Sequence, residues 1–131
     1  MSMFIFSNPK TSWFGQTGTV NCIIESTREH LDQSGTEDFR RCIVDMYRPL
    51  DVEGQVFIDL SNADIGCFNY FYAMCQQAML MFPESPWGMR VDPPYVEVIV
   101  NTWKQVLEFL REDERFDKDR VARIDVSLRS I

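Results

Sequence analysis

The sequence predicts an α+β fold, a single domain in which a small, mostly antiparallel sheet packs against three helices. The chain has 131 residues, a length that suits one domain, and 45% of them are hydrophobic, enough to build a core. Short runs rich in β-branched residues predict strands, and longer segments with apolar residues three or four positions apart predict helices. The chain has no internal repeat, low-complexity tract or linker, so we expect residues 1–131 to form one globular domain.

The first part of the chain predicts two strands. Met3–Phe6 is a short apolar run, and Thr19–Glu25 is rich in β-branched residues. Trp13–Gly18 contains several turn-forming residues, so the two strands can pair as a hairpin across this connection.

Two helices are predicted next, with a strand between them. Ser34 and Glu37 form a capping box that opens a helix through Arg48, just before Pro49. Residues 55–60 then form a compact apolar strand. A second capping box, Ser61-Asn-Ala-Asp64, opens a helix through Phe82 with Leu60 and Ile65 as its hydrophobic staple. This helix is apolar on almost every side, so we expect it to be the central buried one.

A third helix follows a loop at residues 83–94. Asp92 can cap this helix, with Pro93 and Pro94 in its first turn, and the helix should run to about Glu114. The tail at residues 120–128 fits a helix or a strand, and we favour the strand. The residues of the third helix that we expect to face the core are Val96, Ile99, Val100, Trp103, Leu107 and Leu110.

Acidic side chains outnumber basic ones, and the excess is concentrated in one region. The chain holds 20 Asp+Glu and 13 Lys+Arg, for a formal net charge of −7. Residues 25–64 alone hold ten acidic residues and four arginines, net −6, whereas residues 100–131 hold seven of each sign. An acidic surface repels phosphate, so we expect no nucleic acid and no membrane as partner. This stretch either is a solvated face that keeps the protein soluble or complements a cationic partner.

The chain carries few residues suited to catalysis. His30 is the only histidine, and it lies in a polar stretch with no nucleophile beside it. Asp59 lies inside a predicted strand, where an outward-facing carboxylate needs no catalytic explanation. Hydrolase, P-loop and dinucleotide-binding signatures are absent from the sequence. We therefore expect no enzyme, no catalytic residue and no cofactor.

The four cysteines, Cys22, Cys42, Cys67 and Cys75, each lie beside an apolar residue. They form no C-x-x-C pair, and a lone histidine cannot complete a Cys₂His₂ zinc site, so no metal is expected. We predict buried free thiols. The N-terminus lacks the features of a signal peptide, and no apolar run reaches the ~18–20 residues of a membrane-spanning helix. A cytoplasmic protein with reduced cysteines is the resulting expectation.

These features favour a protein that binds another protein. We predict an inhibitor of a basic partner, most concretely a bacterial immunity protein that neutralises a cationic, nuclease-type toxin, because a toxin that holds nucleic acid must itself be basic. Trp87 lies between Pro86 and Gly88 in a predicted loop, where an aromatic residue is a candidate interface anchor. The predicted partner-binding residues are Glu29, Asp32, Glu37, Asp38, Asp45, Asp51, Glu53 and Trp87.

Two alternative functions stay open at this point. The chain could be a non-catalytic subunit or adaptor of a larger assembly, using Trp87 and its proline-rich loop. It could also be a small enzyme that uses a cysteine nucleophile or a carboxylate pair, in which case Cys42→Ser or Asp59→Asn would abolish turnover. Neither the identity of the partner nor the oligomeric state follows from the sequence.

Overall fold

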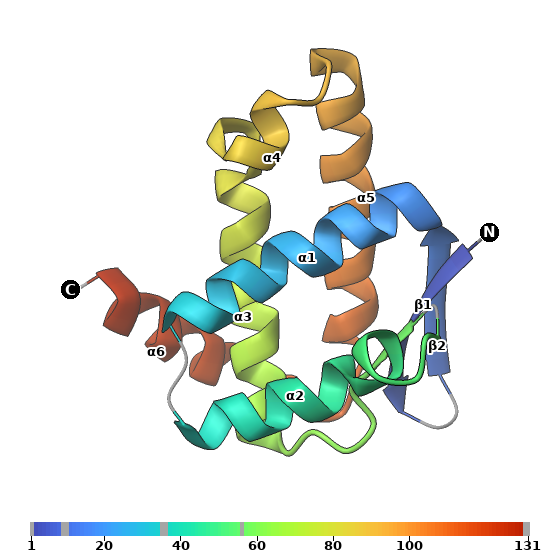
Figure 1. The fold of residues 1–131 in the computed structure, drawn as a ribbon. Helices are drawn as coiled ribbons and strands as arrows, with labels where there is room; N and C mark the ends of the chain where they lie inside the picture. The colour runs from blue at the N-terminus through green and yellow to red at the C-terminus, as the bar shows by residue number, and fades with distance from the viewer. Residues whose placement is uncertain (1, 9–10, 35–36, 56, 130–131) are drawn as a thin grey trace.

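The fold was analysed in a computed structural model, which describes residues 2–8, 11–34, 37–55 and 57–129. The chain is mostly helical and carries one small sheet (Figure 1). Five helices longer than ten residues occur in the described part of the chain: α1 (Thr17–Ser34), α2 (Glu37–Asp51), α3 (Ile65–Met81), α5 (Pro93–Arg111) and α6 (Lys118–Arg129). A 3₁₀ turn, η1 (Phe82–Glu84), and the one-turn helix α4 (Pro86–Met89) connect α3 to α5.

The sheet has three strands in the order β2-β1-β3 and is mixed. β1 (Ser2–Asn8) pairs antiparallel with β2 (Thr11–Gln16), with Phe4 opposite Phe14, and parallel with the short β3 (Phe57–Asp59). Its main helix contacts are with α1 and α2. The predicted combination of helices and a small sheet is therefore present. The predicted arrangement of a mostly antiparallel sheet on three helices holds only loosely, because one strand pair is parallel and helices dominate.

Helix α3 is the centre of the core, as its apolar sequence predicts. It packs against α1, α5 and α6, and in Figure 1 α1 crosses in front of α3 and α5. An almost continuous run of its residues from Cys67 to Cys75 is buried. Because the middle of α3 is buried, it needs no polar face there, and helix-on-helix packing supplies its stability.

The largest correction concerns Thr19–Glu25, which lies within α1 and is not a strand. Val20, Ile23 and Ile24 are almost completely buried, at 0%, 1% and 1% exposure, and Leu31 continues the same stripe. This three-to-four spacing places the β-branched residues on one buried face of the helix, so burial outweighs their local strand preference. The strand that pairs with β1 is β2, which includes part of the segment predicted to be a turn.

Two further predictions were wrong at helix ends. Residues 120–128 lie within α6, where Val121 is buried, so the helical alternative holds and the favoured strand does not. The N-cap of α3 is Asp64, whose side chain accepts a hydrogen bond from the Cys67 N–H at 2.7 Å. Ser61 instead donates its backbone N–H and its hydroxyl to Asp59, at 2.9 and 2.5 Å, which closes the turn after β3.

The remaining helices agree with prediction apart from their ends. α2 continues through Pro49 to Asp51 instead of stopping at Arg48. α5 begins at Pro93 with Asp92 in the N-cap position, although the Asp92 side chain makes no cap hydrogen bond. Of the six predicted inward residues of α5, Ile99, Trp103, Leu107 and Leu110 are buried, and Val96 and Val100 are partly buried against the core.

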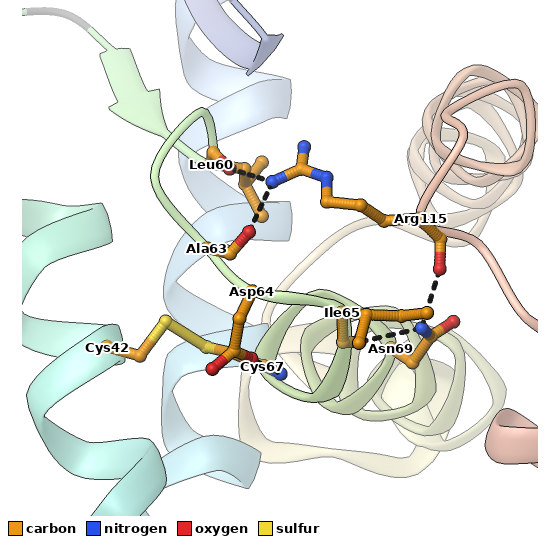
Figure 2. Close-up of a disulfide and its surroundings, with 8 residues drawn as sticks. All are labelled: Cys42, Leu60, Ala63, Asp64, Ile65, Cys67, Asn69 and Arg115. Carbon is orange, nitrogen blue, oxygen red and sulfur yellow. Dashed lines mark hydrogen bonds between the residues drawn. A yellow bond between two sulfur atoms is a disulfide. The ribbon is translucent and has the colours of Figure 1, made fainter.

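The prediction of four free thiols was wrong for two of them. Cys42 on α2 and Cys67 on α3 form a disulfide, with their Cα atoms 6.6 Å apart (Figure 2). Cys22 and Cys75 are free and buried, as predicted. The spacing of the cysteines in the sequence does not show that α2 lies across the start of α3. The disulfide between Cys42 and Cys67 therefore could not be predicted from the sequence.

Arg115, which follows α5, holds the turn before α3 in place (Figure 2). Its guanidinium donates to the carbonyl oxygens of Leu60 and Ala63 at 2.6 and 2.7 Å, pairs with Asp113 at 2.9 Å, and lies 4.5 Å from the Phe68 ring centroid. The guanidinium thus joins the segment after β3 to the segment after α5.

Candidate functional site

The candidate site is a face of α1 that carries the acidic positions of this helix. Arg28 and Glu29 follow Glu25 by three and four residues on α1, so both lie on the same side of the helix as Glu25. Arg28 bridges Glu25 at 3.5 Å and Asp51 at 3.0 Å, and its guanidinium carbon lies 4.1 Å from the Tyr47 ring centroid. The end of α2 is thereby joined to the middle of α1, and this face carries three carboxylates and one guanidinium.

The residues around Arg28 stabilise its charged form. Partial burial acts to lower the pKa of Arg28, but the hydrogen bond to Asp51 and the negative charges of Glu25 and Asp51 outweigh it and raise the pKa above its ordinary value. Arg28 is therefore a permanently charged internal partner for two of the acidic residues. The third acidic residue of this face, Glu29, has a different partner.

Glu29 is joined to Trp87, which lies 58 positions away in the sequence. The indole Nε1–H of Trp87 donates to Glu29 Oε1 at 3.0 Å. Next to Glu29 on α1, the Nε2 atom of His30 lies 3.4 Å from the Met81 sulfur, and its Nδ1 atom lies 3.2 Å from the Ser26 carbonyl oxygen. Helix α1 therefore meets the end of α3 and the short helix α4 at this place, which we call the Glu29–Trp87 junction (Glu29, His30, Met81 and Trp87).

The local sequence of α4 presents Trp87 at the surface. Ser85 caps α4 by accepting from the Gly88 N–H at 3.0 Å and donates its hydroxyl to the Phe82 carbonyl at 2.6 Å. Pro86 fits the first turn, where a missing N–H costs nothing. Gly88 approaches Phe82 so closely that a Cβ atom would lie 1.9 Å from its carbonyl oxygen, so only glycine fits there. Trp87 remains 37% exposed beside this rigid turn.

The structure places the predicted partner-binding residues in two groups. Glu29, Asp51 and Trp87 are connected through the contacts of α1. Asp45 is exposed on α2 and pairs with Arg48 at 3.3 Å, and Glu53 is exposed in the turn after α2. Asp32 lies on α1, and Glu37 and Asp38 lie at the start of α2, but their side chains are outside the described part of the structure.

Sequence reasoning missed three members of this face. Arg28 was not recognised as the link between Glu25 and Asp51, although its position three residues after Glu25 is a helical ion-pair spacing. Met81 belongs to the helix that we expected to be buried on almost every side, but it is 55% exposed. His30 lies in a polar stretch of sequence and is half-buried against Met81. The helical spacing within α1 could have indicated the ion pair between Glu25 and Arg28. The contacts of Met81 and Trp87, in contrast, depend on tertiary structure alone.

The described residues offer no group of three or more His, Cys, Asp or Glu side chains arranged to hold a metal ion. No helix in the described part of the chain combines the length and apolarity needed to span a membrane.

Two open pockets lie beside α6, away from the α1 face. The first has a volume of about 430 Å³ and is lined in part by Arg111 and Lys118. The second has a volume of about 340 Å³ and is lined in part by Arg120 and Arg123.

Comparison with known proteins places the fold. No protein-family model matches the chain, and no curated protein matches it in sequence. Among solved structures, a chain of the complex described as the CdiA-CT toxin from Burkholderia pseudomallei E479 with its cognate CdiI immunity protein has a similar fold. The TM-score is 0.70 at 16% sequence identity, and the match covers 88% of this chain and 99% of that one.

Proposed function

We propose that this chain is an immunity protein, a non-enzymatic inhibitor that binds a cationic, nuclease-type toxin and neutralises it. The observation that carries the proposal is the fold likeness, over 99% of the matched chain, to a toxin–immunity complex. The likeness spans most of both chains, so it is not confined to a common supersecondary motif.

The charge distribution supports the immunity side of such a pair. A nuclease-type toxin needs basic residues to hold a phosphate backbone, and its inhibitor gains association rate and specificity from acidic residues. This chain has a net charge of −7, with net −6 in residues 25–64. Its histidine contacts a methionine and a backbone carbonyl, and its free cysteines are buried, so none of these groups is presented for catalysis.

The proposed contact surface is the α1 face together with the outer side of α2. Exposed carboxylates across this surface attract a cationic partner over a distance of about one Debye length, ~8–10 Å in physiological salt. Each exposed charge contributes modestly, because solvent screens it. The proposed partner-contacting residues remain Glu29, Asp32, Glu37, Asp38, Asp45, Asp51, Glu53 and Trp87.

The test is co-expression with the protein encoded immediately upstream of this chain, which in a toxin–immunity pair is the toxin. The expected result is that the chain co-purifies with a basic protein and restores growth to cells that express it. Charge reversal at Glu37, Asp38 and Asp45 should weaken this complex at low salt, and Glu108→Lys on α5, outside the acidic stretch, serves as the matched control. Absence of a complex, or of any effect of the three reversals at low salt, would overturn the proposal.

A second candidate function, an adaptor in a larger assembly, is favoured by one observation. Of the nine large apolar side chains that are exposed in the described part of the chain, six lie between Leu80 and Val98. An adaptor that uses this region would self-associate or bind an apolar partner regardless of salt. Size-exclusion chromatography of the wild type and of Trp87→Ala separates the two, since the immunity proposal predicts no change in elution.

A further inference from the structure

Glu29 differs from the carboxylates around it in having no cationic partner within the described part of the chain. Glu25 and Asp51 share Arg28, and Asp45 pairs with Arg48. The Glu29 carboxylate instead accepts a hydrogen bond from the neutral indole N–H of Trp87. A neutral donor orients the carboxylate but leaves its charge uncompensated, so Glu29 presents a fixed negative charge at the surface.

Two exposed apolar side chains belong to this junction. Trp87, which holds the carboxylate, is 37% exposed, and Met81, which contacts the neighbouring His30, is 55% exposed. The turn at Ser85 and Gly88 holds the indole in place. The junction therefore combines an oriented negative charge with an exposed indole and an exposed thioether.

A cationic side chain on an aliphatic stem matches this surface in both respects. Its charged head can hydrogen-bond to the free side of the Glu29 carboxylate, and its methylene groups can cover the indole and the thioether. A cation near an indole face is further attracted by the ring quadrupole. Because Trp87 already holds the carboxylate, less side-chain entropy is lost when the cation binds.

We propose that the Glu29–Trp87 junction receives one arginine or lysine side chain of the toxin and forms the energetic centre of the interface. The inference rests on the proposed function and deepens it. The other acidic residues then act mainly on the association rate through their long-range field, whereas the junction acts on the dissociation rate through direct contact. Trp87 is one of the six exposed apolar side chains between Leu80 and Val98. This concentration of apolar surface near the junction in the sequence favours a partner with apolar residues around its basic side chain.

The test compares Glu29→Gln with Glu108→Gln in surface plasmon resonance against the upstream-encoded toxin domain, in an inactive form. Both variants lose one exposed negative charge, but Glu108 lies on α5, outside the proposed contact surface. Glu29→Gln should raise the dissociation rate about tenfold or more, and Glu108→Gln should change it less than about twofold. Trp87→Phe, which keeps a ring but removes the N–H donor, should also raise the dissociation rate. The double variant should be weaker than wild type by less than the product of the two single effects.

The outcomes separate the two proposals. If the wild type forms no complex, the proposed function and this inference both fail. If the wild type binds but Glu29→Gln dissociates within about twofold of it, or if Glu108→Gln raises the dissociation rate equally, only the inference fails. Thermal unfolding of each variant shows whether a change in binding reflects loss of fold, and exposed single substitutions of this kind should leave the melting temperature within a few degrees of wild type.

Discussion

Cys42 and Cys67 are joined by a disulfide that ties α2 to the first turn of α3. Helix α2 is thereby linked covalently to the helix at the centre of the core (Figure 2). The bond closes a loop with a sequence separation of 25, which contains β3 and the turn that Arg115 holds. The position of α2 relative to the core therefore depends on this bond as well as on packing.

Reduction of this disulfide should lower the free energy of unfolding by about 3 kcal/mol, because a loop of this length restricts the unfolded chain. Urea unfolding with and without dithiothreitol measures the difference. The Cys42→Ala/Cys67→Ala variant should unfold identically in both conditions, which controls for effects of the reductant on Cys22 and Cys75. Equal stability of oxidised and reduced wild type would contradict the predicted contribution.

Arg115→Ala should lower the free energy of unfolding by about 3–5 kcal/mol. The substitution removes two hydrogen bonds to backbone carbonyls and the ion pair with Asp113, whose side chain is 4% exposed. The Asp113→Asn/Arg115→Ala double variant should recover part of the loss, because it removes the buried carboxylate charge that the guanidinium had balanced. Urea denaturation measures all three proteins, and no recovery in the double variant would argue against the buried-charge explanation.

Gly88→Ala should destabilise the protein, whereas Gly18→Ala should not. A Cβ at position 88 would meet the Phe82 carbonyl oxygen, but a Cβ at position 18, within α1, has no heavy atom within 4 Å. Alanine at Gly18 should stabilise α1 by up to about 1 kcal/mol through its higher helix propensity. Because α4 carries Trp87, Gly88→Ala should also shift the tryptophan fluorescence spectrum. An unchanged spectrum and melting temperature in Gly88→Ala would contradict the tight packing of this turn.

Alkaline pH should destabilise the fold through buried acids. Burial raises the pKa of Cys75 from 9.0 to about 11, and burial also raises the pKa values of Cys22 and Tyr47. A raised pKa means that the folded state holds the proton more tightly than the unfolded state. The stability from Cys75 is therefore complete below pH 9, is lost as pH rises through about 11, and amounts to about 3 kcal/mol. Urea unfolding between pH 8 and 11 checks this, and Cys75→Ala should show a smaller decline than wild type.

The sequence predicted those elements whose signals are local. The apolar pattern and flanking prolines located α3 and α5, and the residues that cap or end these helices lie within a few positions of the prediction. The sequence-based prediction failed for α1, because Val20, Ile23 and Ile24 favour strands locally, whereas their burial in the core stabilises the helix. The candidate site was predicted in part: Glu29, Asp51 and Trp87 were named, but not that Glu29 and Trp87 meet. A contact between positions 58 apart has no periodic signature in a single sequence.

The central claim, that an acidic surface of this chain captures a cationic toxin, is tested most directly by the salt dependence of association. The association rate constant of wild type and of an Asp45→Asn/Asp51→Asn/Glu53→Gln variant should be measured by stopped-flow fluorescence against the upstream-encoded toxin domain over a range of ionic strength. We expect the wild-type rate constant to fall steeply as salt increases, and the variant to associate about tenfold more slowly at low salt and to converge on wild type at high salt. A wild-type rate constant that does not change with salt, or the absence of association, would contradict the account.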